Sequence, residues 1–328
     1  MSRVSGNFVL PTRGRQVVAA CLIVAACSPR AQSQTVYWAQ VLDNQVQRLT
    51  LGGTPEPLLQ SSVADLALDV PGQALYWTQT VEDRIVRWEI DGGDPQTIVT
   101  WPAADDPTAI HVDAAGGFIY WAQLGGPRIM RADLDGANAT EMVEWPVVID
   151  PVAVAVDSTA QWLFWVESPG DRIMRMPLSG GTAVQIVGWP SVSEAVDLAV
   201  DSAAGKIYWA QVVSDRIRRA DLDGGNLETL WSWPETDDVV SITLDAASNK
   251  LYWAQTFGDR LVRGDLSSSD IETLLTFPLL DDPISLAFDP TVVAPIPAAS
   301  TWGLVAFVLF LLAMGTLVLA KRRSPRAE

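Results

Sequence analysis

Short apolar runs that end in an aspartate recur along the chain, and an aromatic pair follows each of them. Leu66-Ala67-Leu68 precedes Asp69, for example, and Leu286-Ala287-Phe288 precedes Asp289. Short alternating segments of this kind are typical of β-strands. The aromatic pairs are Tyr37-Trp38, Tyr76-Trp77, Tyr120-Trp121, Phe164-Trp165, Tyr208-Trp209 and Tyr252-Trp253. The first gap between pairs is 39 residues and every later gap is 44, and a period in this range indicates a repeat protein.

Two further columns repeat with the same period. The aspartates that end the apolar runs are Asp69, Asp113, Asp157, Asp201, Asp245 and Asp289. The arginines that follow the aromatic pairs are Arg48, Arg87, Arg131, Arg175, Arg219 and Arg263. Tight-turn sequences such as Asp135-Gly136 and Asp223-Gly224 come next. Each repeat therefore predicts four short strands: an inner strand ending in aspartate, the aromatic strand, the arginine strand and a fourth strand.

Four strands at this period predict a blade of a β-propeller, with an open solenoid as the alternative. The first repeat begins at Thr35 without an inner strand, whereas Ile284–Asp289 is an inner strand with no aromatic strand after it. A ring in which this last strand completes the first blade removes the exposed sheet edge. The sequence thus predicts an all-β, six-bladed β-propeller over residues 35–290, closed by the C-terminal strand.

The repeat resembles the LDL-receptor class B (YWTD) repeat, a family of six-bladed propellers. The likeness rests on Leu-Ala-x-Asp, Leu-Tyr-Trp-Thr/Ala-x, Asp-Arg-Ile-x-Arg and Leu-Asp-Gly, and it covers about Thr35 to Pro290. The chain departs from the family at the fourth motif residue, where the family has Asp; here the residues are Gln40, Gln79, Gln123, Glu167, Gln211 and Gln255. Because glutamine carries no charge, we expect the arginine column to pair with the aspartate column or with the aspartate before the arginine strand.

Composition narrows the functional classes. Both cysteines, Cys21 and Cys27, lie before the repeats, so the propeller has neither disulfides nor thiolate metal sites. Residues 35–290 carry 38 acidic side chains against 14 basic ones, a formal net charge of −24. This charge argues against a nucleic-acid partner, which requires a basic surface. Solubility is the simplest explanation of the charge, and binding of a cation or a basic partner is the alternative.

The two ends of the chain predict export. Residues 1–33 combine early arginines, an apolar run and small residues, as a signal peptide does; a lipoprotein signal at Cys27 is the alternative. A Pro/Ala linker (291–301) then leads to an uncharged segment (302–320) long enough to span a bilayer, followed by a basic end (321–328). Basic residues stay cytoplasmic, so the propeller is expected outside, at the cell envelope or surface. The tail resembles the IPTL-CTERM and PEP-CTERM type of bacterial sorting signal, which implies that it is processed.

The loops between the fourth strand and the next blade carry two columns. The aromatic column is Trp101, Trp145, Trp189, Trp233 and Phe277, and the acidic column is Asp106, Asp150, Glu194, Asp238 and Asp282. Phe257 lies in a loop between the second and third strands, which reaches the same face. We predict a ligand-binding face with these aromatics. The carboxylates are candidate ligands for Ca²⁺, and a purely structural role in a repeated turn is the alternative.

One histidine, His111, stands in a column otherwise filled by alanine or threonine, in the middle of an inner strand. A lone histidine of this kind is more often a core residue than a catalytic group. The inner strands are otherwise apolar and alanine-rich, which disfavours an enzyme. The predicted function is therefore an exported binding or scaffold propeller with an unknown protein or extracellular ligand and no cofactor. The alternative is a Ca²⁺-dependent lactonase-like or lyase-like enzyme.

Overall fold

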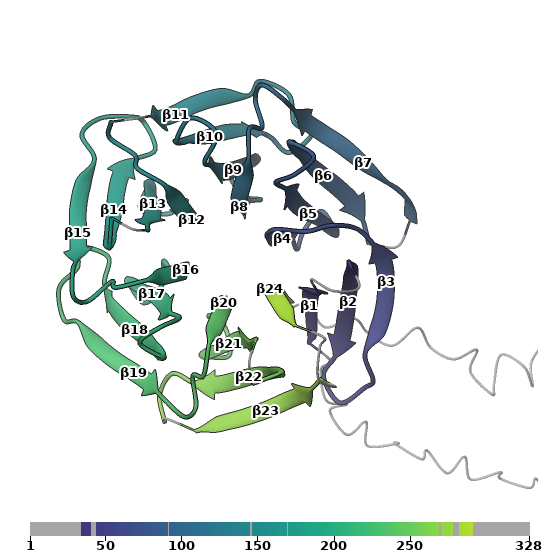
Figure 1. Cartoon of the computed structure of the whole chain (residues 1–328), viewed down its shortest axis with the longest axis vertical. Helices are drawn as coiled ribbons and strands as arrows, with labels where there is room; N and C mark the ends of the chain where they lie inside the picture. Colours follow the sequence, from purple (N-terminus) through teal and green to yellow (C-terminus); the bar gives the residue numbers. More distant parts are fainter. Residues whose placement is uncertain are drawn as a thin grey trace, which may run out of the picture. The chain divides into compact units, whose positions relative to one another are not determined.

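The computed structural model describes residues 34–290 except 41–43, 91, 145, 169, 257, 269 and 278–281. The predicted signal peptide, linker, membrane segment and basic end lie outside the described residues. Among the residues that are described, there is no helix with the length and apolar character needed to cross a membrane. All their elements are strands, and these form six four-stranded sheets arranged in a ring (Figure 1).

Each sheet is one antiparallel blade, with its first strand at the centre of the ring (Figure 1). Blade 1 consists of β24 (Pro283–Asp289), β1 (Thr35–Gln40), β2 (Gln45–Thr50) and β3 (Glu56–Gln60). Blade 2 consists of β4 (Leu66–Asp69), β5 (Ala74–Gln79), β6 (Arg84–Glu89) and β7 (Gly92–Thr100). Blade 3 consists of β8 (Pro107–Asp113), β9 (Phe118–Gln123), β10 (Arg128–Asp133) and β11 (Thr140–Glu144).

The second half of the ring repeats this arrangement. Blade 4 consists of β12 (Pro151–Asp157), β13 (Trp162–Glu167), β14 (Arg172–Pro177) and β15 (Val184–Gly188). Blade 5 consists of β16 (Ala195–Asp201), β17 (Lys206–Gln211), β18 (Arg216–Asp221) and β19 (Glu228–Ser232). Blade 6 consists of β20 (Val239–Asp245), β21 (Lys250–Gln255), β22 (Arg260–Asp265) and β23 (Ile271–Thr276). The six-bladed propeller predicted from the repeat is therefore confirmed.

The ring closes as predicted. Strand β24 pairs with β1, so that Leu286 lies opposite Trp38 and Phe288 opposite Val36. Phe288 also stacks on Tyr252 of blade 6, with ring centroids 4.5 Å apart. The last strand thus joins the first and last blades, and the edge of β1 is hydrogen-bonded rather than exposed.

The aromatic strands are buried on both faces because each lies between two neighbouring blades. The tryptophans Trp38, Trp77, Trp121, Trp165, Trp209 and Trp253 are all at most 1% exposed. Their contacts cross from blade to blade: Tyr76 and Ile85 of blade 2 pack in one cluster with Trp121 and Met130 of blade 3. One blade alone would leave these faces in water, which explains why the aromatic pair must recur in every repeat.

The aspartate column forms turns rather than ion pairs. The Oδ1 atom of Asp69 accepts a hydrogen bond from the backbone N–H of Gly72 (2.9 Å), and Oδ1 of Asp245 accepts one from the backbone N–H of Ser248 (3.1 Å). Equivalent bonds are made by Asp113, Asp157 and Asp201. These side chains fix the turn between the first and second strands, which is a common use of aspartate.

The arginine column pairs with glutamates and aromatic rings. The expected pairing with aspartates is therefore wrong for Arg48, Arg87, Arg131, Arg175 and Arg219. Arg48 and Arg219 form ion pairs with glutamates of the fourth strand, Glu56 and Glu228. The Nε of Arg87 donates to the hydroxyl of Tyr76 (2.9 Å). Other members lie over rings, as Arg175 does over Trp162 at 4.5 Å and Arg131 over Phe118 at 4.6 Å. The arginines therefore link strands at the outer part of each blade.

The fourth motif residues are buried, and in two blades they accept a hydrogen bond from the tryptophan of the same strand. The Nε1 of Trp121 donates to Gln123 (3.0 Å), and the Nε1 of Trp165 donates to Glu167 (2.8 Å). Glu167 is fully buried and also accepts from the Nε of Arg172 (2.6 Å). A glutamine can thus replace the family's aspartate as an acceptor, as the sequence predicts.

Candidate functional site

One face of the ring is formed by two sets of loops that hydrogen-bond to each other. The 2–3 loops join the second and third strands of a blade, and the 4–1 loops join its fourth strand to the next blade. The backbone N–H of Leu124, in a 2–3 loop, donates to the carbonyl of Asp106, in a 4–1 loop (3.1 Å). The backbone N–H of Val212, in another 2–3 loop, likewise donates to the carbonyl of Glu194, in a 4–1 loop (3.3 Å). The two sets of loops therefore make a single surface, called here the loop face.

The acidic column shapes the 4–1 loops through its backbone. Asp106, Glu194 and Asp238 all adopt positive φ values, of 48°, 54° and 47°. The backbone N–H of Asp106 donates to the side chain of Asp83 (2.9 Å), and that of Asp238 donates to Asp215 (3.1 Å). Asp150 also has positive φ, and Asp282 precedes β24. No group of three or more acidic, histidine or cysteine side chains suited to a metal occurs among the described residues.

The aromatic column divides into exposed and buried members. Trp101, Trp189 and Trp233 are 65%, 74% and 65% exposed. Phe277, placed on the same face by the sequence, is only 8% exposed and packs on Trp38 of blade 1 with ring centroids 5.7 Å apart. The prediction that Phe277 belongs to the ligand-binding face is therefore wrong. Phe277 is a core residue, because its apolar ring packs between blades 6 and 1. Trp145 and Phe257 lie outside the described residues.

Other apolar side chains in these loops are also exposed. Val81 and Val213 lie in 2–3 loops and are 91% and 68% exposed. Further exposed members of the loops are Leu124, Val147 and Ile149. Elsewhere in the described chain, the large apolar side chains that are exposed are Val184 and Leu227. Exposed apolar side chains are therefore concentrated on the loop face.

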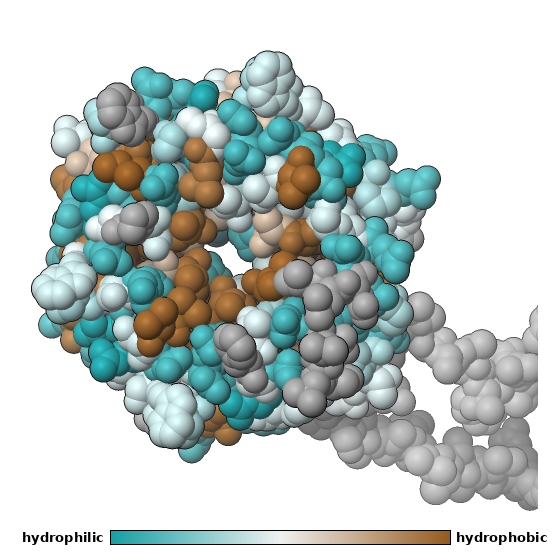
Figure 2. All heavy atoms as spheres, in the orientation of Figure 1, coloured by the Kyte–Doolittle hydropathy of each residue, from teal (hydrophilic) through white to brown (hydrophobic). Residues whose placement is uncertain are grey.

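The second feature of this face is the channel at the centre of the ring (Figure 2). It holds a cavity of about 220 Å³, whose walls carry leucine, isoleucine, valine and phenylalanine side chains together with Asp65, His111 and Asp197. A smaller space at the start of the inner strands also contacts Asp65, Asp197 and Ser241. The inner strands begin where the 4–1 loops end, so the two carboxylates lie toward the loop face.

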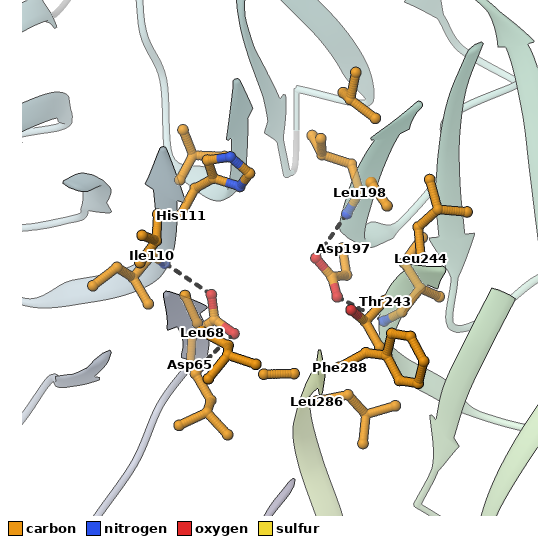
Figure 3. A pocket seen from close by; sticks show the side chains of 18 residues that line it. Asp65, Leu68, Ile110, His111, Asp197, Leu198, Thr243, Leu244, Leu286 and Phe288 are labelled. Atoms are coloured by element: carbon orange, nitrogen blue, oxygen red, sulfur yellow. Dashed lines mark hydrogen bonds between the residues drawn. The ribbon is translucent and has the colours of Figure 1, made fainter. Parts of the chain in front are cut away.

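The channel carboxylates belong to a column that the sequence interpretation overlooked. At intervals of 44 residues, this column reads Asp65, Ala109, Ala153, Asp197, Ser241 and Ser285. The expectation of apolar, alanine-rich inner strands is therefore wrong at Asp197 in β16, and it overlooks Asp65 directly before β4. These residues belong to blades 2 and 5, which are opposite one another in a ring of six, and Figure 3 shows their carboxylates on opposite sides of the cavity. The fixed offset in the sequence was the signal that would have revealed them.

Hydrogen bonds hold both carboxylates in place. Asp65 accepts from the backbone N–H groups of Leu66 (2.9 Å) and Ile110 (2.8 Å) and from the hydroxyl of Ser285 (2.7 Å). Asp197 accepts from the backbone N–H groups of Leu198 (2.7 Å) and Ile242 (2.7 Å) and from the hydroxyl of Ser241 (3.0 Å). Both carboxylates thus bridge to the inner strand of the next blade, and Asp65 also bridges to the inner strand of the preceding blade through Ser285.

Burial changes the acid–base behaviour of all three channel groups. Burial raises the pKa of Asp65, and burial together with the negative charge of Asp65 raises the pKa of Asp197 to about 7. The pKa of His111 falls to about 4 because burial disfavours the imidazolium, although the charge of Asp113 opposes this change. At neutral pH the histidine is uncharged and Asp197 is only partly ionised.

Comparisons with known proteins support the fold. The sequence matches no family model, and it matches no functionally characterised protein significantly. Solved structures do match. A chain of the nidogen/laminin complex has 20% sequence identity and a TM-score of 0.69, and the match covers 78% of this chain and 98% of that one. Streptogramin B lyase has 17% identity and a TM-score of 0.59, with 77% and 83% covered.

A third similar structure is TolB from Acinetobacter baumannii, with 14% identity, a TM-score of 0.63, and 79% and 67% of the two chains covered. One of these structures is named as a lyase and another as part of a protein complex. Likeness at such low identity carries the architecture and not the activity. The chain is a six-bladed β-propeller similar in structure to these proteins.

Proposed function

We propose that this protein is an exported binding module whose partner docks on the loop face. The observation that carries the proposal is the distribution of exposed apolar side chains. Eight of the ten large apolar residues that are exposed in the described chain lie in the 2–3 and 4–1 loops: Val81, Trp101, Leu124, Val147, Ile149, Trp189, Val213 and Trp233. Concentrations of exposed apolar surface are characteristic of interaction sites.

The chemistry of these residues suits a macromolecular partner. Tryptophan is enriched among the residues that dominate binding energy in protein interfaces. The loops stand on a rigid ring of sheets, which is the usual arrangement for recognition. A propeller with a net charge of −24 repels anionic surfaces, so we propose a neutral or basic protein rather than nucleic acid as the partner. The sequence of both ends supports a location at the cell envelope, outside the cytoplasm.

A matched set of variants tests the face. Trp101→Ala, Trp189→Ala and Trp233→Ala are combined in one full-length chain, and Val184→Ala with Leu227→Ala form the control. All five side chains are exposed, so both variants should melt close to the wild type. We expect the triple variant to lose the partners that the wild type captures from envelope material and the control to retain them. Loss in the control with retention in the triple variant would place binding elsewhere.

The enzyme alternative has one observation in its favour, which is that Asp65, His111 and Asp197 line a single cavity. A cavity that gathers titratable groups with displaced pKa values is a common property of active sites. Hydrolysis of lactone substrates by the wild type, abolished by His111→Ala, would favour this alternative. If no lactone is hydrolysed even when the protein is as concentrated as the substrate, the enzyme alternative is wrong.

A further inference from the structure

The channel combines features that together specify a kind of ligand. Most of the residues that line it are apolar, among them Leu68 of blade 2, Leu244 of blade 6 and Phe288 of blade 1, although more of the wall surface is polar than apolar. Its charged groups are the two carboxylates on opposite sides (Figure 3). The volume of about 220 Å³ lies below the 300–1,000 Å³ or so of pockets that hold drug-sized molecules. The cavity therefore suits a small group with an apolar body and a positive charge.

Both carboxylates keep the capacity to accept another hydrogen bond. A carboxylate offers about four acceptor positions, and the protein occupies three on each of them. Among the described residues, the donor to Asp65 Oδ2 is Ile110 alone, and the donor to Asp197 Oδ1 is Leu198 alone. These two oxygens each retain a free acceptor position. A donor that carries a positive charge would satisfy them and would also relieve the repulsion between the two carboxylates.

His111 supplies a second, independent polar feature in the same cavity. Its imidazole lines the cavity wall in β8 and hydrogen-bonds to no described residue. Because burial keeps this imidazole uncharged at neutral pH, it does not repel a cation. An enclosed polar group without a protein partner normally has a partner from solvent or a ligand.

A metal ion fits the channel less well than an organic cation. Calcium takes six to eight oxygen ligands, whereas the described residues place no three acidic, histidine or cysteine side chains together for a metal. An ammonium group needs only a few acceptors, and its carbon body would contact the leucine and phenylalanine walls.

We propose that the channel binds a primary ammonium group on a small apolar body, held between Asp65 and Asp197. A free alkylamine and a lysine side chain of a docked polypeptide share this chemistry. The proposal concerns the channel alone and stands apart from the partner of the loop face. Trp101→Ala, Trp189→Ala and Trp233→Ala should leave the binding of a free amine unchanged, so that failure of one proposal does not imply failure of the other.

Binding should release a proton. The titratable side chains that line the cavity in the described chain are Asp65, His111 and Asp197, and Asp113 acts on His111 from its own strand. The raised pKa of Asp197, about 7, means that this carboxylate is largely protonated at pH 6 and largely ionised at pH 8. A cation favours the ionised form, so affinity should fall as pH falls. A one-proton linkage predicts about tenfold weaker binding at pH 6 than at pH 8.

Titration calorimetry on the full-length chain tests the proposal with four probes: n-pentylammonium, n-pentanol, Nα-acetyl-lysine amide and calcium chloride. We expect n-pentylammonium or the lysine probe to bind, n-pentanol to bind at least tenfold more weakly, and calcium not to compete. Binding of n-pentylammonium alone would identify free amines as the ligand class, and binding of the lysine probe alone would identify a polypeptide side chain. Failure of both amines to bind, or competition by calcium, would overturn the proposal.

Two variants and one control locate the site. Asp65→Asn and Asp197→Asn keep one acceptor oxygen, which can serve one of the two backbone N–H groups that bond to each carboxylate. Each should weaken amine binding more than tenfold because one of the two charges is lost. Asp94→Asn, at an exposed position of β7, should bind as the wild type does. Equal binding by all three variants would place the amine elsewhere. The comparison of n-pentanol with n-pentylammonium needs no variant, so the test stands even if a substitution impairs folding.

Discussion

Closure of the ring by β24 can be tested with two leucines that occupy the same column. Leu286 of β24 lies opposite Trp38, and Leu198 of β16 lies opposite Trp209. Both leucines are 5% exposed. Leu286→Ala and Leu198→Ala therefore remove the same side chain from equivalent places, one in the closing strand and one within a continuous blade.

The expected cost follows from burial. A buried leucine replaced by alanine loses its transfer free energy and leaves a cavity, at about 2–5 kcal/mol in total. Because the exposures are equal, the two variants should lose similar free energies of unfolding, within about 1 kcal/mol of each other. The exposed Leu227→Ala is the control, and it should stay within about 0.5 kcal/mol of the wild type.

Urea titration of the full-length chains, followed by tryptophan fluorescence, measures the effect. With unchanged slopes, the shift of the midpoint reports the change in stability. A loss for Leu286→Ala as small as that of the control, alongside a normal loss for Leu198→Ala, would refute the closed ring. In that case the C-terminal strand would contribute nothing to blade 1.

Three further predictions concern buried polar groups. Glu167→Gln should cost little because a glutamine fills this position in the other blades, whereas Glu167→Ala should cost about 1–3 kcal/mol in denaturant titrations because the buried Nε1 of Trp165 loses its acceptor. The imidazole of His111 should titrate by NMR near pH 4, and a midpoint near 6.5 would contradict its burial. Asp197→Asn should raise the melting temperature more at pH 8 than at pH 5. Because folding raises the pKa of Asp197 from 3.8 to about 7, the folded state favours the protonated carboxyl, and the stability that it contributes is lost as the pH rises through this range. An equal effect of Asp197→Asn at both pH values would contradict this.

The fold could be predicted from the sequence because every structural requirement recurs with the same period. The six buried tryptophans, the turn-forming aspartates and the unpaired strand at each end all pointed to one closed ring. The turn signals were equally direct: Gly136 and Gly224 have positive φ values of 84° and 88°. A side chain at Gly136 would also collide with the carbonyl of Ile98 in the preceding blade, a contact between repeats that no local pattern shows.

The functional features were harder to predict because they depend on which neighbour covers a side chain. Phe277 and Trp233 stand in the same column, yet one packs against Trp38 and the other is exposed. Asp65 and Asp197 were missed because they precede the apolar runs by a single residue. Their opposition across the channel becomes visible only once the 44-residue offset is applied to that position and the ring is known to close.

Docking on the loop face can be tested most directly by crosslinking in the cells that make the protein. A photoreactive amino acid is placed at Val213 in a 2–3 loop, or at Leu227, where both native side chains are exposed. We expect a partner adduct from position 213 that disappears when Trp189 and Trp233 are replaced by alanine, and no adduct from position 227. The same adduct from position 227, with none from position 213, would contradict this expectation.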